Sequence, residues 1–248
     1  VEDHLEKEFI AGLPFQLTGD QQKAIEEIDA DMKKTHPMHR LLQGDVGSGK
    51  TAVAFAAAAR AISNNAQVII MAPTEVLAKQ HFENAKKVFS HISIEDESNL
   101  FSARTPNIEM LSTNVGTKDR DRIQKLIDED NLDIIIGTHA LLYQEYKYKK
   151  LGLVVVDEQH RFGVDQRSKL ISGNEIAPHL LVMSATPIPR TAAMLFFGDL
   201  KNTIIKEMPK GRKAIKTTWA NTQAKVDKAY KKVRDEIAKG AQAYVVCP

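Results

Sequence analysis

The sequence predicts an α/β fold in which a mostly parallel β-sheet is covered by helices on both faces. Short runs rich in β-branched residues alternate with segments whose apolar residues recur about every 3.6 positions, the pattern of βαβ units. The run Leu153–Val156 is apolar without alternation, which is typical of a strand buried on both faces. The predicted strands are Arg40–Gln43, Val68–Ala72, Ile108–Ser112, Asp133–Gly137, Leu153–Asp157 and Leu180–Ser184.

The composition is that of a chain with a packed core. Apolar residues make up 43% and charged residues 27% of the 248 residues, which argues against disorder. A formal net charge of +2 excludes a histone-like basic protein, and a single cysteine, Cys247, excludes an internal disulfide framework. The start shows no signal-peptide pattern, and no apolar run reaches the roughly 20 residues that span a bilayer. We therefore expect a cytoplasmic protein without membrane contact.

Charge is distributed unevenly along the chain. Residues 1–208 carry 24 basic and 29 acidic residues, whereas residues 209–248 carry 10 basic and 3 acidic. Such a shift predicts a domain boundary, and Pro209 and Gly211 suit a linker. The expected organisation is a lead-in at 1–13, a first domain at 14–208, a linker at 209–213 and the truncated start of a second domain at 214–248.

The last segment is too short to form a core of its own. It is predicted to contain a strand at Ala214–Trp219, a helix with Val226 and Tyr230 on one face, and a strand at Ala243–Val246. The alternative is that this segment packs on the first domain. Upstream, Ile92–Asn107 is polar and irregular, and we expect it to be a surface insertion.

One segment matches the phosphate-loop pattern G-x-x-x-x-G-K-[ST] in full. It lies between a predicted strand and an Ala-rich helix, the setting in which backbone amides and a helix N-terminus bind phosphates. Lys50 is expected to reach the β- and γ-phosphates of ATP, and the Thr51 hydroxyl to bind Mg²⁺. The alternative is a glycine-rich turn before a helix. The predicted nucleotide-binding residues of the loop are Gly44, Asp45, Val46, Gly47, Ser48, Gly49, Lys50 and Thr51.

Two adjacent carboxylates, Asp157 and Glu158, follow the buried strand Leu153–Val156. In a parallel sheet, ligands bind beyond the carboxyl ends of the strands. Asp157 is therefore expected to hold the Mg²⁺ shell, and Glu158 to act as the general base on the attacking water. An acidic turn without a catalytic role is the alternative.

Further motifs accompany these two sites in a fixed order. Asp157–Val164 reads DEQHRFGV, and Ser184–Thr191 reads SATPIPRT. With Ala72–Ala78 and Gly137–Ala140, the series resembles the first RecA-like domain of superfamily 2 helicases, a P-loop NTPase fold. More narrowly, the strings are similar to those of the RecG family of bacterial ATP-dependent DNA helicases.

The resemblance implies further site residues. In this family Gln21 would contact adenine; the structural alternative, which can hold at the same time, is a capping box of Thr18 and Gln21 that starts a helix. Phe15 would stack nearby, or would be a core residue. Ser184 and Thr186, with His160 across the site, would couple the nucleotide to DNA, or would merely cap a helix. The implied DNA contacts, each with a purely structural alternative, are Pro73, Thr74, Gly137, Thr138, His139, Arg161 and Arg190.

The resemblance also implies an activity. The parent protein would hydrolyse ATP with Mg²⁺ to drive branch migration and fork reversal at stalled forks and Holliday junctions, as a monomer associated with the nucleoid. The family's arginine finger and junction-binding wedge domain lie outside this sequence, so we expect the chain to bind ATP and hydrolyse it weakly. The alternatives are a transcription-repair coupling type of duplex DNA translocase and a nucleotide-switched binding module.

Overall fold

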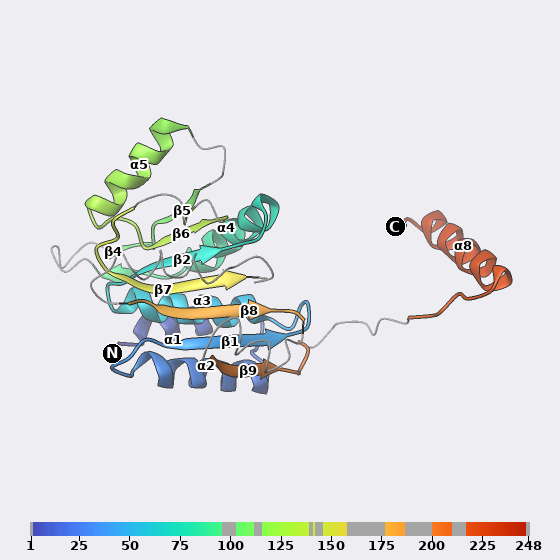
Figure 1. Ribbon diagram of the computed structural model, residues 1–248, viewed down its shortest axis with the longest axis horizontal. Helices are drawn as coiled ribbons and strands as arrows, with labels where there is room; N and C mark the ends of the chain where they lie inside the picture. Colours follow the sequence, from blue (N-terminus) through green and yellow to red (C-terminus); the bar gives the residue numbers. More distant parts are fainter. Residues whose placement is uncertain are drawn as a thin grey trace. The chain divides into compact units, whose positions relative to one another are not determined.

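The computed structural model describes residues 2–95, 103–111, 116–138, 141, 146–157, 177–186, 200–209 and 217–246. The chain divides into two compact units, Val1–Lys210 and Gly211–Pro248. The first unit is built on a parallel seven-stranded sheet of order β5-β6-β2-β7-β8-β1-β9 (Figure 1). Its strands are β1 (His39–Gly44), β2 (Gln67–Met71), β5 (Ile108–Leu111), β6 (Ile134–Gly137), β7 (Leu151–Asp157), β8 (His179–Ser184) and β9 (Lys201–Ile205).

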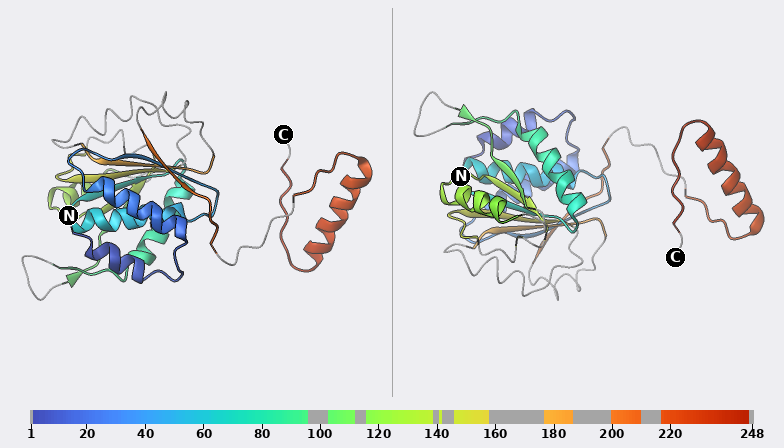
Figure 2. Two further views of the ribbon diagram at one scale, coloured as in Figure 1. Left: turned by 90° about the horizontal axis from the view of Figure 1, so that it is seen from below. Right: turned by 90° about the horizontal axis from the view of Figure 1, so that it is seen from above.

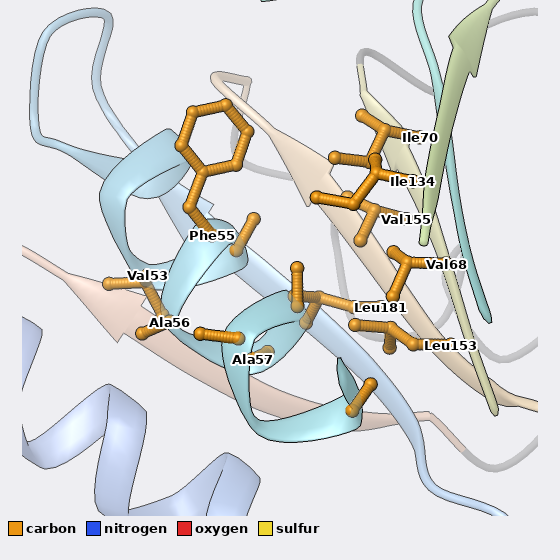
Figure 3. Close-up of a cluster of buried hydrophobic side chains, with 14 of the residues drawn as sticks. Val53, Phe55, Ala56, Ala57, Val68, Ile70, Ile134, Leu153, Val155 and Leu181 are labelled. Atoms are coloured by element: carbon orange, nitrogen blue, oxygen red, sulfur yellow. The ribbon is translucent and has the colours of Figure 1, made fainter. Parts of the chain in front are cut away.

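Helices cover one face of this sheet, with α2, α3 and α4 in contact with the strands and α1 packed on α3 (Figure 2). The helices of the first unit are α1 (His4–Ala11), α2 (Gly19–Met32), α3 (Lys50–Ser63), α4 (Glu75–Phe89) and α5 (Thr117–Asp128). The alanine-rich α3 can approach the sheet closely because its side chains are small, and Ala56 and Ala58 are fully buried. Figure 3 shows this contact, with labels on Val53, Phe55, Ala56, Ala57, Val68, Ile70, Ile134, Leu153, Val155 and Leu181.

A second core lies on the opposite face of the sheet. There α5 buries Ile123 and Ile127 in the cluster that contains Ile69 and Val154. The strands in the middle of the sheet are therefore buried on both faces, as their continuous apolar runs predicted. The predicted α/β fold class is confirmed, and so are the six predicted strands, to within two residues at either end where the ends are described.

The first unit contains elements that were not predicted, among them a helix and a strand. The lead-in contains α1, which buries Leu5 and Phe9. Sheet-edge strand β9 was also missed, because Lys201–Ile205 buries only Thr203 and Ile205 and lacks a long apolar run. The prediction of an irregular insertion at Ile92–Asn107 is wrong at its described ends. There β3 (Ile94–Glu95) pairs with β4 (Ala103–Arg104), and Arg104 forms an ion pair with Asp133.

A buried ionic cluster joins the first three helices. Arg60 of α3 is 1% exposed, and its Nη1 lies 2.6 Å from Glu6 Oε2 of α1 and 2.7 Å from Asp29 Oδ2 of α2. Burial and the neighbouring Asp29 charge raise the pKa of Glu6 to about 7, and burial also raises the pKa of Asp29. The three helices are thus held by one guanidinium shared between two carboxyl groups, and we name these residues the Arg60 cluster.

The start of α2 is joined to the segment after β9. The Asp20 carboxylate accepts hydrogen bonds from the backbone N–H groups of Lys206, at 2.7 Å, and Glu207, at 2.9 Å. In return, Glu207 Oε2 accepts one from the Asp20 backbone N–H at 3.3 Å. The hydrogen bonds from Glu207 and Lys206 lower the pKa of Asp20.

The described part of the second unit contains α8 (Gln223–Ala238), which confirms the predicted helix. The strand prediction for Ala243–Val246 is wrong, since these residues have no regular structure. The predicted strand Ala214–Trp219 is wrong in its described part, because Thr217–Trp219 also have no regular structure, while residues 214–216 lie outside the described part. The physical reason is that a strand needs a partner ladder. Within the described residues, α8 buries none of its side chains.

Candidate functional site

The candidate site lies at the carboxyl edge of the parallel sheet, where the phosphate loop and Asp157 both emerge. Strand β8 lies between β1 and β7. Its Met183 is paired with Leu42 of β1 on one side and with Asp157 of β7 on the other, so the three residues lie in one row across the sheet. With adjacent strands about 4.8 Å apart, Asp157 lies about 10 Å from the strand that leads into the loop. The loop and the first of the two predicted carboxylates are thus on the same edge.

The phosphate loop connects the last residue of β1, Gly44, to the first residue of α3, Lys50. Gly47 and Gly49 have φ angles of +79° and +88°, which side chains with a Cβ rarely adopt. A Cβ at Gly44 would lie 2.5 Å from Ser48 Oγ and 3.1 Å from the Ile205 carbonyl oxygen. The local backbone therefore requires glycine at three positions, as expected for a loop that encloses a phosphate group.

The side chain of Lys50 folds back across the loop. Its Nζ donates to the carbonyl oxygen of Gly44 at 2.6 Å and to that of Asp45 at 3.1 Å. The amine is thus held beside the amide-rich loop at the N-terminus of α3, where the helix dipole favours an anion. Thr51 occupies the first turn of the same helix, and Val46 is exposed on the loop. These residues fit the polyphosphate of a nucleotide.

Gln21 connects the start of α2 to the phosphate loop. Its side chain is 1% exposed; Nε2 donates to the Ser48 carbonyl oxygen at 2.8 Å, and Oε1 accepts from the Thr18 backbone N–H at 2.9 Å. Thr18 Oγ1 in turn accepts from the Gln21 backbone N–H, which completes a capping box. The structural alternative is therefore present, and Gln21 also supports the loop directly. Its contact with adenine stays a prediction.

Phe15 lies just before α2 and is about half exposed. It lines a cavity of about 900 Å³ formed by α1, α2 and the segment between them, together with Ile10, Leu17 and Ile25. An aromatic ring beside such a cavity can stack on a planar group. Adenine stacking by Phe15 stays a prediction.

Asp157 has a partner that was not predicted. His81 of α4 places Nε2 2.7 Å from Asp157 Oδ2, and the two side chains are 8% and 13% exposed. A sequence signal was present: His81 interrupts the buried face of α4, which also carries Ala78, Ala85 and Phe89. A polar residue at a helical position spaced for burial indicates a specific partner.

Ser184 and Thr186 lie at the end of β8, between the strands that carry the loop and Asp157. Ser184 Oγ donates to the Thr186 carbonyl oxygen at 3.1 Å and accepts from the Thr186 backbone N–H at 3.2 Å. Ser184 is fully buried and paired in register with Gln43 of β1. The structure thus brings these hydroxyl groups to the candidate site, and their coupling role stays a prediction.

Four of the residues predicted to contact DNA follow two neighbouring strands. Pro73 and Thr74 follow β2. Gly137 is the last residue of β6 and is paired with Met71, and Thr138 follows it. Thr74 also caps α4, since its Oγ1 accepts from the Leu77 backbone N–H at 3.3 Å. A structural role is therefore present for Thr74. Five further site residues of the prediction lie outside the described residues: His139, Glu158, His160, Arg161 and Arg190.

Mg²⁺ in nucleotide sites is bound by one or two protein oxygens together with phosphate groups, so a dense cluster of ligands is not required. Among the described residues, no group of three or more His, Cys, Asp or Glu side chains could hold a metal ion. The roles of Thr51 and Asp157 as oxygen ligands of a Mg²⁺–nucleotide complex stay predictions. Within the same residues, no helix combines the length and apolarity needed to cross a bilayer.

Comparison with known proteins agrees with this geometry. The chain is 43% identical to the ATP-dependent DNA helicase RecG of Treponema pallidum, over 98% of the chain and 34% of that protein. It is also 43% identical to the ATP-dependent DNA helicase RecG of Thermotoga maritima, over 100% of the chain and 30% of that protein. A solved structure of RecG bound to a three-way DNA junction matches with a TM-score of 0.83 and 39% identity, over 100% of the chain and 31% of that structure. The chain therefore spans about a third of the length of these relatives.

The predicted resemblance to RecG helicases is confirmed by these matches. The family described as DEAD/DEAH box helicase matches residues 18–195, which include the phosphate loop, Asp157 and Ser184. This match covers most of the first compact unit. The chain belongs to the DEAD/DEAH box helicase family.

Proposed function

We propose that residues 14–208 form the ATP-binding motor domain of a RecG-type DNA helicase, and that residues 214–248 begin its second domain across a linker at 209–213. The observation that carries the proposal is the position of the phosphate loop and Asp157 on one edge of the sheet, separated only by β8. Both the similarity to RecG and the DEAD/DEAH family match support it.

The residues of the loop have distinct roles in this proposal. The amides of the loop and of the first turn of α3 bind the β-phosphate, and the Lys50 amine turns from the Gly44 and Asp45 carbonyls to the phosphate oxygens. Thr51 and Asp157 hold Mg²⁺, which would neutralise charge that develops on the phosphates. Glu158 accepts the proton of the attacking water.

The first experiment measures binding of a fluorescent ATP analogue to wild type, Lys50→Ala and Lys79→Ala. Hydrogen bonds from charged groups contribute about 1.5–3 kcal/mol, so Lys50→Ala is expected to weaken binding by about 10- to 150-fold. Lys79 is a matched control, because its side chain is 69% exposed on α4. Equal affinity of all three proteins would contradict the proposed site.

We also propose that these residues alone hydrolyse ATP slowly. The resemblance to superfamily 2 helicases implies that a second domain completes the cleft with an arginine finger, and such an arginine is worth about 10³–10⁵ in rate. In the described part of the second unit, α8 has no buried face and no strand accompanies it. Steady-state ATPase should stay low with and without branched DNA. Robust stimulation by DNA would contradict this part of the proposal.

In the whole protein, we propose that this motor acts on branched duplex DNA, at stalled forks and Holliday junctions, to drive branch migration and fork reversal. The relative solved on a three-way DNA junction supports this substrate class. Phosphate contacts from Thr74, Thr138 and their neighbours would position the duplex without reading its sequence. We further propose that the protein is a monomer in the bacterial cytoplasm, associated with the nucleoid, which sedimentation and imaging of the full-length protein would test.

A further inference from the structure

The contact between His81 and Asp157 joins a helix to the strand end that carries the predicted metal ligand. Nε2 of His81 and Oδ2 of Asp157 are 2.7 Å apart, within the range of a short hydrogen bond to a charged acceptor. Both side chains are mostly buried, so water does not compete freely for this bond. The contact spans 76 residues of sequence and belongs to the tertiary fold.

The chemistry of the two groups fixes the direction of the bond. A carboxylate oxygen only accepts hydrogen bonds, so the hydrogen is carried by His81 Nε2. His81 Nδ1 is buried and has no hydrogen-bond partner among the described residues. The contact with Asp157 therefore requires hydrogen on Nε2.

We propose that His81 is a positioning residue for Asp157: it occupies Oδ2, fixes the plane of the carboxylate and leaves Oδ1 as the oxygen that serves Mg²⁺. This inference rests on the proposed function of the site. Carboxylates that bind metals are held by hydrogen bonds of this kind, and loss of such a partner typically weakens metal affinity or activity by about 10- to 100-fold.

A purely structural role for His81 predicts a different outcome. The buried face of α4 contains Ala78, Ala85 and Phe89 on either side of His81, so this residue also fills space between the helix and the sheet. If packing were its only role, an apolar side chain of similar size would serve equally well. The proposal requires instead a hydrogen-bond donor at the position of Nε2.

The experiment uses the whole chain and two variants that differ in that donor. His81→Gln can place its amide nitrogen near the position of Nε2, whereas His81→Leu keeps an apolar volume and removes the donor. His179→Leu is the matched control: His179 Nδ1 accepts from the Met38 backbone N–H at 2.9 Å, at the amino end of β8 and therefore at the opposite edge of the sheet. A fluorescent, non-hydrolysable ATP analogue is bound to each protein, and Mg²⁺ is titrated.

We expect the Mg²⁺ midpoint of His81→Leu to rise by about 10- to 100-fold, with binding of the metal-free analogue changed by less than about twofold. His81→Gln should recover most of the loss, and His179→Leu should match wild type. Equal midpoints for His81→Leu and wild type, or for His81→Leu and His81→Gln, would overturn the inference. Absence of analogue binding by wild type at any Mg²⁺ concentration would instead overturn the proposed function, and the inference with it.

A second measurement does not depend on the variants folding. Long-range ¹H–¹⁵N spectra of imidazole rings in the wild-type chain identify which nitrogen of His81 carries hydrogen. The expected result is hydrogen on Nε2, with a ring resonance that moves when Mg²⁺ is added to the analogue complex. Hydrogen on Nδ1 alone would remove the donor that the inference requires and would overturn it.

Discussion

Replacing Arg60 with methionine tests how the first three helices are held together. Arg60 is almost completely buried, and its guanidinium is shared by Glu6 of α1 and Asp29 of α2. Methionine retains part of the packing of the arginine stem but leaves two carboxyl groups buried without a cation. The variant therefore isolates the electrostatic contribution of the Arg60 cluster.

The structure gives the expected magnitude. Removal of one partner from a buried ion pair costs about 3–5 kcal/mol, because a charge stays in the interior uncompensated. For a chain of this size each 1 kcal/mol lowers Tm by about 2–4 °C, so a fall of about 6–20 °C is expected. Arg122→Met is the matched control. Its side chain is 51% exposed in a pair with Glu109, and such surface pairs contribute less than about 1 kcal/mol.

The loss of unfolding free energy caused by Arg60→Met should be larger at high pH than at low pH. Without the guanidinium, the folded state raises the pKa of Glu6 and Asp29 further above their values in the unfolded chain. The folded variant then binds more protons than the unfolded variant, and its stability falls as pH rises. Urea unfolding followed by far-UV circular dichroism should show a larger penalty at pH 8 than at pH 5. A penalty no larger than that of Arg122→Met, or one larger at pH 5, would refute the reasoning.

Three further predictions concern single positions. Gly49→Ala should weaken binding of the ATP analogue by at least about tenfold, because Gly49 has a φ of +88° and a Cβ there would overlap Gln21 Nε2. Gly240→Ala is the control, since Gly240 has a φ of +89° but open space around it, and this variant should bind the analogue normally. Glu6→Gln should make the free energy of unfolding less dependent on pH between about 4.5 and 7. The raised pKa of Glu6 makes the folded wild type bind more protons than the unfolded chain in this range, so its stability falls as pH rises. Urea unfolding midpoints measured across this range test the prediction. Trp219 is 80% exposed, so its emission should match that of free indole in water, and a blue-shifted native spectrum would contradict its described exposure.

The sequence predicted the strands and the phosphate loop well because their signals are local. A continuous apolar run such as Leu153–Val156 has few alternatives to a strand buried on both faces, and Gly44–Thr51 fits a single motif. Parallel pairing then places the carboxyl ends of all strands at one edge, which is why Asp157 and the loop could be predicted to lie together.

The features that sequence reasoning missed depend on tertiary contacts. Strand β9 forms by adding an edge to β1, and α1 is stabilised by packing on α3 and by Arg60. The partnership of His81 with Asp157 joins distant segments, so spacing within α4 shows only that a polar residue is buried, not which partner it has. Ala243–Val246 shows the converse case, since its strand propensity is realised only when a neighbouring strand supplies the hydrogen bonds.

The reciprocal hydrogen bonds between Asp20 and Glu207 have a mechanical consequence. The first compact unit ends at Lys210, three residues after Glu207, so the chain leaves this unit from a point that is tied to the first turn of α2. Asp20 is adjacent to Gln21, whose amide supports the Ser48 carbonyl of the phosphate loop. Tension applied to the chain beyond Lys210 would therefore be borne at the first turn of α2, one residue from the support of the phosphate loop.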